Sequence, residues 1–412
     1  MILLYIDPGT GSMLFGILVA VIGALTYLVR SLIMKLRFVM SGGRAEGRNE
    51  HKLSLVIFSD DKRYWPVFEP VCRELDRRGM DTVYMTASKN DPGLSNSYEH
   101  IKGEFIGEGN KAFARLNLLN AYIVLSTTPG LDVYQWKRSR YVDHYVHMLH
   151  GPNEIAGYRM FGIDYYDALL LSGEYQVNDA RNLEKIRNLP EKEIVLIGIP
   201  YMDEMVRRLE SSGMDKEHER TVLLAPTWGE SSIFNRFGGR IIEILRETGY
   251  QIIIRPHPQS FTSEAKLMGE LMSAYPESDR LHWNRDVDNF ETLRQSDILI
   301  SDFSGVTLEF ALVFDRPVIY ADTEYDSSPY DTWWLDTPFW TLGALERIGM
   351  KLTEDNVTDL KEMIDDCIEN PRFASERGSV RNETWIYPGE GASRAADYLI
   401  SKYDELTRTE EM

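Results

Sequence analysis

The sequence has few of the residues by which common functional classes are recognised. It contains only two cysteines, Cys72 and Cys367, which are far apart and lack metal-ligand spacing, so we expect neither a disulfide framework nor a zinc cluster. Acidic residues outnumber basic ones, and the net charge of -19 argues against a general nucleic-acid binder, because such proteins need a basic surface. We expect the main part of the protein to be globular, to have reduced cysteines and to lie in the cytoplasm. An anionic ligand would need a local positive pocket.

Several nucleotide and hydrolase motifs are also missing. The chain has no good GxGxxG or Walker signature and no GxSxG nucleophile elbow. The glycine-containing segment at residues 103–109 lacks a strand-to-helix context, so we interpret it as a loop. A dehydrogenase, a P-loop ATPase and a Ser/His/Asp hydrolase are therefore disfavoured.

An uncharged, mainly apolar run of 17 residues occupies positions 13–29. This length is at the lower limit for a helix that crosses a bilayer. Asp7 is the only charged side chain before the run, whereas five basic residues follow it: Arg30, Lys35, Arg37, Arg44 and Arg48. Because cytoplasmic flanks carry the excess of Lys and Arg, we expect a single-pass transmembrane helix with the body in the cytoplasm. A helix that lies on the membrane surface is the alternative.

The rest of the 412-residue chain contains two consecutive α/β patterns. We place a membrane anchor and linker at residues 1–50, an N-terminal acceptor-side domain at 51–212 and a C-terminal nucleotide-donor domain at 213–412. The predicted strands are at 53–58, 82–86, 121–126, 145–149, 168–172, 194–197, 221–225, 251–255 and 297–300, and the predicted helices are at 64–78, 239–248 and 305–314. The expected fold is α/β, with two Rossmann-like domains that face a ligand cleft.

A strand followed by a helix N-terminus makes Ser301-Asp302-Phe303-Ser304-Gly305 a candidate phosphate site. Free backbone N–H groups and the positive end of the helix dipole favour a phosphate there, with the hydroxyls of Ser301 and Ser304 as further donors. Ordinary N-capping by Ser304 or Asp302 is the alternative. Glu309 lies just over one turn further along the helix, where it would accept ribose hydroxyls or be an ordinary exposed side chain.

A second candidate segment, Arg255-Pro256-His257-Pro258, closes another predicted strand. Arg255 offers a planar fork for phosphate oxygens, and the two prolines stiffen the loop that aims His257. A neutral His257 would donate a hydrogen bond to a bridging or leaving-group oxygen, and a protonated one would neutralise developing charge. The alternative is a histidine that satisfies loop carbonyls.

His150 is the best candidate for a general base. It follows the apolar run at 145–149 and precedes Gly151-Pro152, so it should project from the carboxyl end of a strand toward the cleft. His144 and His147 precede it at three-residue spacing. The β-branched and aromatic residues around them predict a strand, on which these two side chains diverge, and this disfavours a metal site.

Aromatic residues crowd one further segment. Trp333, Trp334 and Trp340 lie near Asp331 and Asp336 in the sequence. The segment is either a mobile aromatic lid or acceptor platform, or an ordinary packed loop.

Five short stretches are similar to one known family: His150-Gly151-Pro152, Ala225-Pro226-Thr227-Trp228, Arg255-Pro256-His257-Pro258, Ser301-Asp302-Phe303-Ser304 and Gly391-Ala392-Ser393-Arg394. In these stretches the chain resembles the CDP-glycerol glycerophosphotransferases, membrane-associated enzymes that build polyol-phosphate polymers such as wall teichoic acid. The resemblance implies a glycosyltransferase B-like fold. It implies that His150 is the general base and that His257 is a donor-phosphate ligand that assists departure of CMP. It further implies a pyrophosphate loop of Ser301, Asp302 and Ser304, joined by Ser393 and Arg394. We add Thr227, Arg255 and Glu309 to the donor-phosphate or nucleotide site.

The chain departs from the family at two positions. The family often has a second serine where Gly305 stands and an arginine where Gly229 stands. The leading hypothesis is a membrane-anchored transferase that moves a glycerol-phosphate-like group from a CDP-linked donor to a hydroxyl of a lipid-linked or membrane-associated acceptor, and releases CMP. No cofactor or metal is expected. A glycosyltransferase with a nucleotide-sugar donor and a catalytically silent membrane scaffold are the alternatives.

Overall fold

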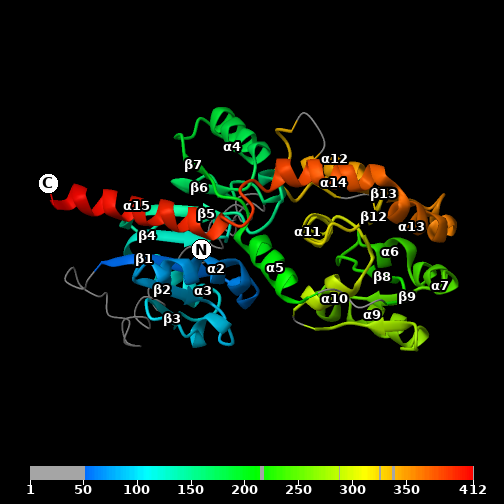
Figure 1. The fold of residues 1–412 in the computed structure, drawn as a ribbon. Helices are drawn as coiled ribbons and strands as arrows, with labels where there is room; N and C mark the ends of the chain where they lie inside the picture. The colour runs from blue at the N-terminus through cyan, green and yellow to red at the C-terminus, as the bar shows by residue number, and fades with distance from the viewer. Residues whose placement is uncertain (1–51, 214–217, 287, 324–325, 336–338, 412) are drawn as a thin grey trace, which may run out of the picture. The chain divides into compact units, whose positions relative to one another are not determined.

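The structure, a computed structural model, describes residues 52–213, 218–286, 288–323, 326–335 and 339–411 (Figure 1). The residues from Leu53 onward belong to a single unit. The predicted membrane segment at 13–29 lies outside the described residues. Within the described part of the chain, no helix is long and apolar enough to cross a bilayer.

The first sheet is parallel throughout and has the strand order β3-β2-β1-β4-β5-β6-β7. Its strands are β1 (Leu53–Ser59), β2 (Thr82–Thr86), β3 (Ile101–Phe105), β4 (Asn120–Ser126), β5 (Tyr141–Met148), β6 (Ala168–Leu171) and β7 (Glu193–Leu196). In β1 every side chain from Leu55 to Phe58 is fully buried, as expected where helices cover both faces of a parallel sheet. The strand order reverses between β1 and β4, which is the switch point of a doubly wound sheet.

Helical segments connect these strands, since parallel neighbours need crossover connections. They are η1 (Lys62–Tyr64), α2 (Trp65–Arg77), η2 (Pro92–Ser95), α3 (Asn110–Leu116), η3 (Ile155–Gly157) and α4 (Glu174–Arg187). Helix α2 buries Val67, Val71 and Leu75 on one face. Gly79 follows it with φ +73°, a conformation that favours glycine after a helix.

The second sheet repeats the same plan, with the parallel order β10-β9-β8-β11-β12-β13. Its strands are β8 (Thr221–Leu224), β9 (Gln251–Ile254), β10 (Leu281–Trp283), β11 (Ile298–Ser301), β12 (Val318–Ala321) and β13 (Gly349–Leu352). Its helical segments are α6 (Ile233–Phe237), α7 (Arg240–Glu247), α8 (Ser260–Ser263), α9 (Ala265–Ala274), α10 (Phe290–Gln295), α11 (Val306–Val313), α12 (Trp340–Ile348), η4 (Val357–Asp359), α13 (Leu360–Glu369) and α14 (Pro371–Thr384). The strand order reverses between β8 and β11.

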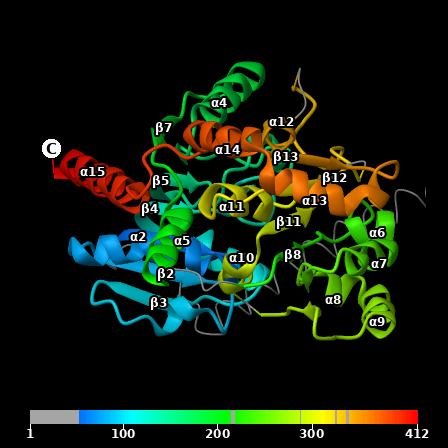
Figure 2. The ribbon, with the colours of Figure 1, turned by 45° about the vertical axis from the view of Figure 1, so that its right-hand side comes forward.

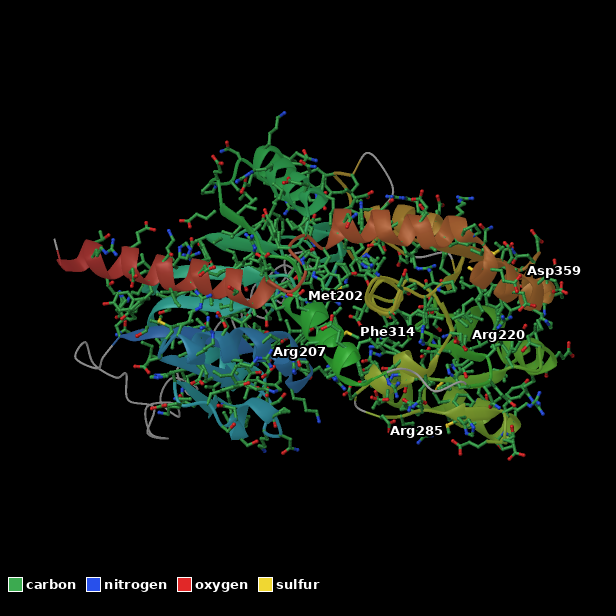
Figure 3. The ribbon with its side chains drawn as sticks, viewed as in Figure 1. Met202, Arg207, Arg220, Arg285, Phe314 and Asp359 are labelled. Carbon is green, nitrogen blue, oxygen red and sulfur yellow. The ribbon has the colours of Figure 1, made fainter. Side chains whose placement is uncertain are left out.

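Two helices pack against the opposite half of the fold. Helix α5 (Pro200–Ser211) follows the first sheet, yet its Met202 belongs to one buried cluster with Phe314 of the second half (Figure 3). Helix α15 (Gly391–Glu411) ends the chain and lies beside α2 and β4 in both ribbon views (Figures 1 and 2). Its Leu399 is fully buried in the core beneath β1. The last helix, which the predicted domain at 213–412 includes, therefore completes the core of the first half.

Most of the elements expected from the sequence are confirmed. Each predicted strand overlaps an observed one, and the helices predicted at 64–78, 239–248 and 305–314 are α2, α7 and α11, each one residue shorter at both ends. Continuous apolar runs and helical apolar spacing gave a clear signal in these segments.

The interpretation of residues 103–109 as a loop is wrong. Gly103 lies in the edge strand β3, and α3 begins at Asn110, so the segment does connect a strand to a helix. Only Ile101 is buried in this strand, so it has no apolar run to mark it. A Cβ at Gly103 would lie 2.4 Å from the carbonyl oxygen of Gly93, and this close backbone approach accounts for the glycine.

Candidate active site

The candidate residues lie on loops at the carboxyl ends of the strands, where doubly wound folds bind their ligands. In the second sheet, three neighbouring strands contribute: β9 leads into Arg255, β8 into Thr227 and β11 into Asp302. Backbone contacts join these loops. The N–H of His257 donates to the Pro226 carbonyl at 3.1 Å, and the N–H of Thr227 donates to the Asp302 carboxylate at 3.0 Å. The three loops thus form one connected edge.

Ser301 and Asp302 hold this edge together with their side chains. Ser301 is fully buried, and its hydroxyl donates to the Ala225 carbonyl at 2.6 Å. The Asp302 carboxylate accepts the N–H groups of Thr227 and Ile233, and burial raises its pKa to about 6. Both side chains therefore shape the loop from inside, although the sequence suggested that the Ser301 hydroxyl faces a phosphate.

The groups left at the start of α11 are those that a phosphate could use. The side chain of Ser304 is half-buried and makes no hydrogen bond within the described residues. At the start of α11 the N–H groups of Thr307 and Leu308 already donate to the carbonyls of Ser304 and Gly305, which leaves those of Gly305 and Val306 for a ligand. Glu309 lies one turn further on and is half-buried, and this burial raises the pKa of its carboxyl to about 7.

The loop after β9 presents Arg255 and His257. The guanidinium of Arg255 donates to the side-chain oxygen of Asn284, and burial lowers its pKa. The Nδ1 of His257 accepts the N–H of Gln259 at 3.1 Å. A neutral His257 therefore carries its proton on Nε2, the nitrogen that is left to donate to a ligand. Burial, together with the positive charges of Arg63 and Arg255, lowers the pKa of His257 and favours this neutral form.

His150 follows β5 at the carboxyl edge of the first sheet. Its Nδ1 lies 3.0 Å from the hydroxyl oxygen of Thr127, and its ring meets that of Tyr64 edge to face at 5.3 Å. Burial lowers the pKa of His150 to about 4. The imidazole is therefore neutral at physiological pH, as a general base requires.

Two cavities adjoin these loops. The His150 cavity, of about 250 Å³, is lined by Leu149, His150, Gly151, Asn153, Glu154, Gly157, Tyr158, Phe303, Tyr330, Phe339, Thr341 and Leu342. The Tyr320 cavity, of about 390 Å³, is lined by Asp302, Phe303, Tyr320, Ala321, Asp322, Thr323, Ser327, Thr332, Leu335, Phe339, Leu342, Leu345, Glu346 and Lys351. Phe303 contributes to both, so the turn after β11 faces the same space as His150. Arg255 and His257 lie along the neighbouring edge and line neither cavity.

Ser393 and Arg394 have partners at the start of α15. Arg78 of the first half donates to the Ser393 hydroxyl at 3.0 Å. Arg394 pairs with Glu390 at 2.8 Å, and its guanidinium lies 3.4 Å above the ring of Tyr387. The role that the family resemblance implies for these two residues stays a prediction.

His144 and His147, which precede His150 on β5, are accounted for by packing. His144 and His147 lie on β5 and point to different partners, as the strand prediction requires: the Nε2 of His144 is 2.8 Å from the hydroxyl of Tyr398, and the Nε2 of His147 is 3.0 Å from that of Tyr158. Among the residues that the structure describes, no group of three His, Cys, Asp or Glu side chains is placed to hold a metal ion.

The tryptophan-rich segment is packed against the first half. Trp340 stacks on Tyr175 at 4.1 Å between ring centroids, and Trp334 is buried. Asp331 forms a buried ion pair with Arg187 of α4 at 2.5 Å. Packing therefore describes Trp334, Trp340 and Asp331, whereas Trp333 is 59% exposed and Asp336 lies outside the described part.

Comparison with known proteins identifies the family. The family of CDP-glycerol:poly(glycerophosphate) glycerophosphotransferases matches residues 164–387, which is more than half of the chain. The protein belongs to this family. It is therefore a transferase, an enzyme of the CDP-glycerol glycerophosphotransferase type. The matched range begins after His150 and ends before Ser393, so the roles of these residues rest on the local resemblance alone. No curated protein sequence matches the chain.

Solved structures share the fold of this glycerophosphotransferase family member. The wall teichoic acid polymerase TagF, in a crystal soaked with CDPG, has a TM-score of 0.56 at 16% identity, over 92% of this chain and 98% of that one. S. aureus MnaA with UDP has a TM-score of 0.58 at 15% identity, over 85% of this chain and 97% of that one. A UDP-N-acetylglucosamine 2-epimerase from Listeria monocytogenes has a TM-score of 0.56 at 14% identity, over 86% of this chain and 98% of that one. At these identities the likeness shows the fold alone: two parallel α/β halves of the glycosyltransferase B-like kind.

Sequence reasoning missed several residues at the two edges. Asp60 and Arg63 directly follow β1, and Asn153 and Glu154 follow His150 in the His150 cavity. Arg63 belongs to the first half but acts electrostatically on His257 of the second. The signal for Asp60 and Arg63 was available, because charged residues after the first strand of a doubly wound sheet lie at its switch point.

Proposed function

We propose that this enzyme transfers a glycerol-phosphate-like group from a CDP-linked donor to a hydroxyl of a lipid-linked or membrane-associated acceptor, and releases CMP. One observation carries the proposal. His257, whose Nε2 carries the proton, and the open start of α11 lie on one connected edge, and Phe303 of that edge lines the cavity of the neutral His150. The turn before α11 and a neutral base thus adjoin one cavity, with His257 on the loop next to that turn, and this arrangement supports an in-line displacement.

Each of these residues has one role in the proposed reaction. His150 accepts the proton of the acceptor hydroxyl, whose oxygen forms a bond to the phosphorus that carries the polyol. The bond from that phosphorus to the CMP oxygen breaks, and the electron pair leaves with CMP. Arg255, the Nε2–H of His257 and the N–H groups of Gly305 and Val306 stabilise the negative charge that spreads over the phosphoryl oxygens.

The test is to identify the nucleotide that the full-length, detergent-solubilised protein liberates from cytidine and uridine diphosphate conjugates. We expect CMP from CDP-glycerol. His150→Ala and His257→Ala should each lower its release on the order of a hundredfold while the protein stays folded. His100→Ala is the matched control, because His100 pairs with Asp81 on the surface. Release of a nucleoside diphosphate would identify a glycosyltransferase instead, and a protein without saturable CDP affinity would be a scaffold.

We also propose that residues 13–29 anchor the enzyme in the cell membrane, with the catalytic body in the cytoplasm. The apolar run and the basic residues that follow it support this proposal. An anchor confines the enzyme to the plane in which a lipid-linked acceptor lies and so raises their effective concentration. The protein should stay in the membrane pellet after alkaline carbonate extraction, whereas release by carbonate would contradict a spanning helix.

A further inference from the structure

The imidazole of His150 has one hydrogen-bond partner among the described residues, the side chain of Thr127. Its Nδ1 lies 3.0 Å from the Thr127 Oγ1. The ring also meets that of Tyr64 edge to face, with 5.3 Å between the centroids. Two loops, which follow β1 and β4, thus hold the ring. Nε2 is the nitrogen that is left for a ligand in the cavity that His150 lines.

The hydroxyl of Thr127 is itself held in place from both sides. Thr127 directly follows β4 and is 1% exposed. Before it, the Ser126 hydroxyl donates to the Phe58 carbonyl at 2.9 Å and accepts the N–H of Thr128 at 3.1 Å. After it, the Thr128 carbonyl accepts the hydroxyl of Tyr166 at 2.5 Å. Because the neighbouring backbone is bonded in this way, the Thr127 hydroxyl meets His150 in a fixed position, as a preorganised site requires.

No carboxylate orients His150 within the described part of the chain. A histidine base in an enzyme is often held by a carboxylate, which also stabilises the imidazolium. Here no charged side chain offsets the effect of burial on the pKa of His150. Glu154 lines the same cavity, but its carboxyl bonds a hydroxyl of α12 instead. Burial raises the pKa of the phenols of Tyr64 and Tyr158 and lowers that of His147 to about 3, so these neighbours are neutral.

Proton transfer decides which atom of the pair donates. When His150 takes up a proton, both of its nitrogens carry hydrogen, so Thr127 can only accept from Nδ1. The neutral ring has two tautomers. In one, Nδ1–H donates to Thr127 and Nε2 keeps a lone pair that faces the ligand. In the other, the threonine hydroxyl donates to Nδ1 and Nε2 already carries the proton. Only the first tautomer can act as a base at Nε2, and it keeps its hydrogen bond throughout the transfer.

We propose that Thr127 is the positioning residue of the general base: its Oγ1 accepts the Nδ1–H of His150, leaves Nε2 unprotonated and stabilises the imidazolium that forms. This inference rests on the proposed function, in which His150 accepts the proton. The O–H bond of the acceptor breaks, its proton forms a bond to Nε2, and the electron pair stays on the oxygen that attacks phosphorus. Thr127 exchanges no proton. It lines neither cavity and therefore acts through His150.

Nitrogen-15 NMR of the full-length, detergent-solubilised protein with labelled histidine tests the tautomer directly. The signals of His150 are those that disappear in His150→Ala. At neutral pH we expect a protonated Nδ1 and an unprotonated Nε2 in the parent protein, and a shift toward the other tautomer in Thr127→Val. A parent protein whose His150 carries the proton on Nε2 would overturn the inference, whether or not the protein transfers anything.

Kinetics test the same contact through exchange of the hydroxyl for a methyl group. In Thr127→Val the Nδ1–H of the imidazolium lacks a buried acceptor. We expect kcat for CMP release from CDP-glycerol to fall about tenfold to a hundredfold, with an unchanged KM for the donor. Thr127→Ser keeps the hydroxyl and should recover most of the lost kcat. Unchanged kcat in Thr127→Val, or a Thr127→Ser variant that is equally slow, would refute the inference.

A matched control makes the same exchange far from the site. Thr248, at the end of α7, is 7% exposed, and its hydroxyl donates to the Leu245 carbonyl at 2.6 Å. Thr248→Val should leave kcat unchanged, because this residue has no contact with His150. Thermal unfolding of both valine variants verifies that each is folded at the assay temperature.

A double-mutant cycle separates a role through His150 from a merely structural one. Introduced into His150→Ala, the Thr127→Val exchange should cause no further loss of CMP release, because the group that Thr127 positions is absent. A further loss of about tenfold would show that Thr127 acts independently and would overturn the inference. Near-normal turnover of His150→Ala would refute the proposed base and the inference with it. A slow His150→Ala together with an unaffected Thr127→Val would refute the inference alone.

Discussion

At the scale of single residues, Glu309 combines a proposed binding role with a cost in stability. Its pKa is about 7 in the folded protein, above the ordinary value of 4.5, so the folded state binds the proton more tightly than the unfolded state. The contribution of this group to the free energy of unfolding is therefore fully present below pH 4.5 and is lost as the pH rises through 7. Glu309→Gln removes this loss, and we expect it to raise the free energy of unfolding by about 2 kcal/mol at pH 8 and to change little at pH 4.5.

Urea unfolding at the two pH values measures this effect. Glu362→Gln, on the exposed face of α13, is the control and should be neutral at both. An equal gain at pH 4.5 and pH 8 would show that the carboxyl group titrates normally. If Glu309 also accepts ribose hydroxyls, the stabilised variant has a higher KM for the donor.

Gly305 and Gly229, where the family resemblance leads us to expect a serine and an arginine, differ in the side chains that they tolerate. A Cβ at Gly305 would meet only the amide of Asn153, at 3.6 Å, whereas Gly229 has φ +92°. Gly305→Ser should fold with a stability change within about 0.5 kcal/mol and lower KM for the donor, because it adds a hydroxyl at the start of α11. Gly229→Arg should cost about 1–3 kcal/mol through backbone strain.

Thermal unfolding and donor kinetics test both glycine variants. Gly229→Ala is the matched control for Gly229→Arg, since it has the same strain without the guanidinium. If Gly229→Arg is as stable as the parent protein, the strain argument fails. If Gly305→Ser leaves the donor KM unchanged, no phosphate lies at this helix start.

Residue types and their strand-end positions indicated the candidate site, but not the direction of each side chain. The alternation rule separated His144 from His147, because a strand has a period of two. No such periodicity gives the direction of each side chain in a turn such as Ser301-Asp302-Phe303. There the sequence could not show that Ser301 bonds inward to Ala225, since that partner is 76 positions away.

At the scale of elements, one ion pair holds the segment from Ser327 to Leu335 over both cavities. Arg187 of α4 bonds Asp331 of this segment and also Asp164 at 2.7 Å, and all three side chains are at most 8% exposed. Asp331→Ala leaves part of a buried guanidinium unpaired. We expect it to lower the free energy of unfolding by about 3–5 kcal/mol and to raise KM for the acceptor.

Denaturant unfolding checks the magnitude for Asp331→Ala. The exposed pair of Arg181 and Glu191 gives the comparison, because Glu191→Ala should cost less than about 1 kcal/mol. Similar losses in the two variants would mean that the buried pair contributes no more than a surface one.

Element prediction succeeded for most apolar segments, although it missed the fully buried strand β12, and it failed for the strands with few buried residues. The strand β1 has a continuous buried run, and α2 has an apolar stripe, so the sequence predicts both elements clearly. The edge strand β3 and the three-residue β10 are stabilised by pairing with a neighbour that is distant in sequence. Local patterns do not contain that information.

At the scale of the whole molecule, the repeated α/β plan was predictable and the return of the chain to its first half was not. The strand orders follow from alternating strands and helices with right-handed crossovers. Helix α15 comes after the second sheet in sequence, and its apolar stripe fits any sheet face. Its place is fixed by partners such as Asp203, which accepts the N–H groups of Gly389 and Gly391 and so holds the crossing.

This return predicts that the two halves unfold together. Leu399 of α15 is fully buried beneath β1, so Leu399→Ala should cost about 2–5 kcal/mol. Because α5 and α15 each bury apolar side chains in the opposite half, the loss should reach both sheets. Hydrogen exchange measures this: amides of β8 and β11 should lose the same protection as those of β1 and β4, while Ser401→Ala, on the exposed face of α15, changes neither. Loss of protection confined to β1 and β4 would mean that each half is stable without the other.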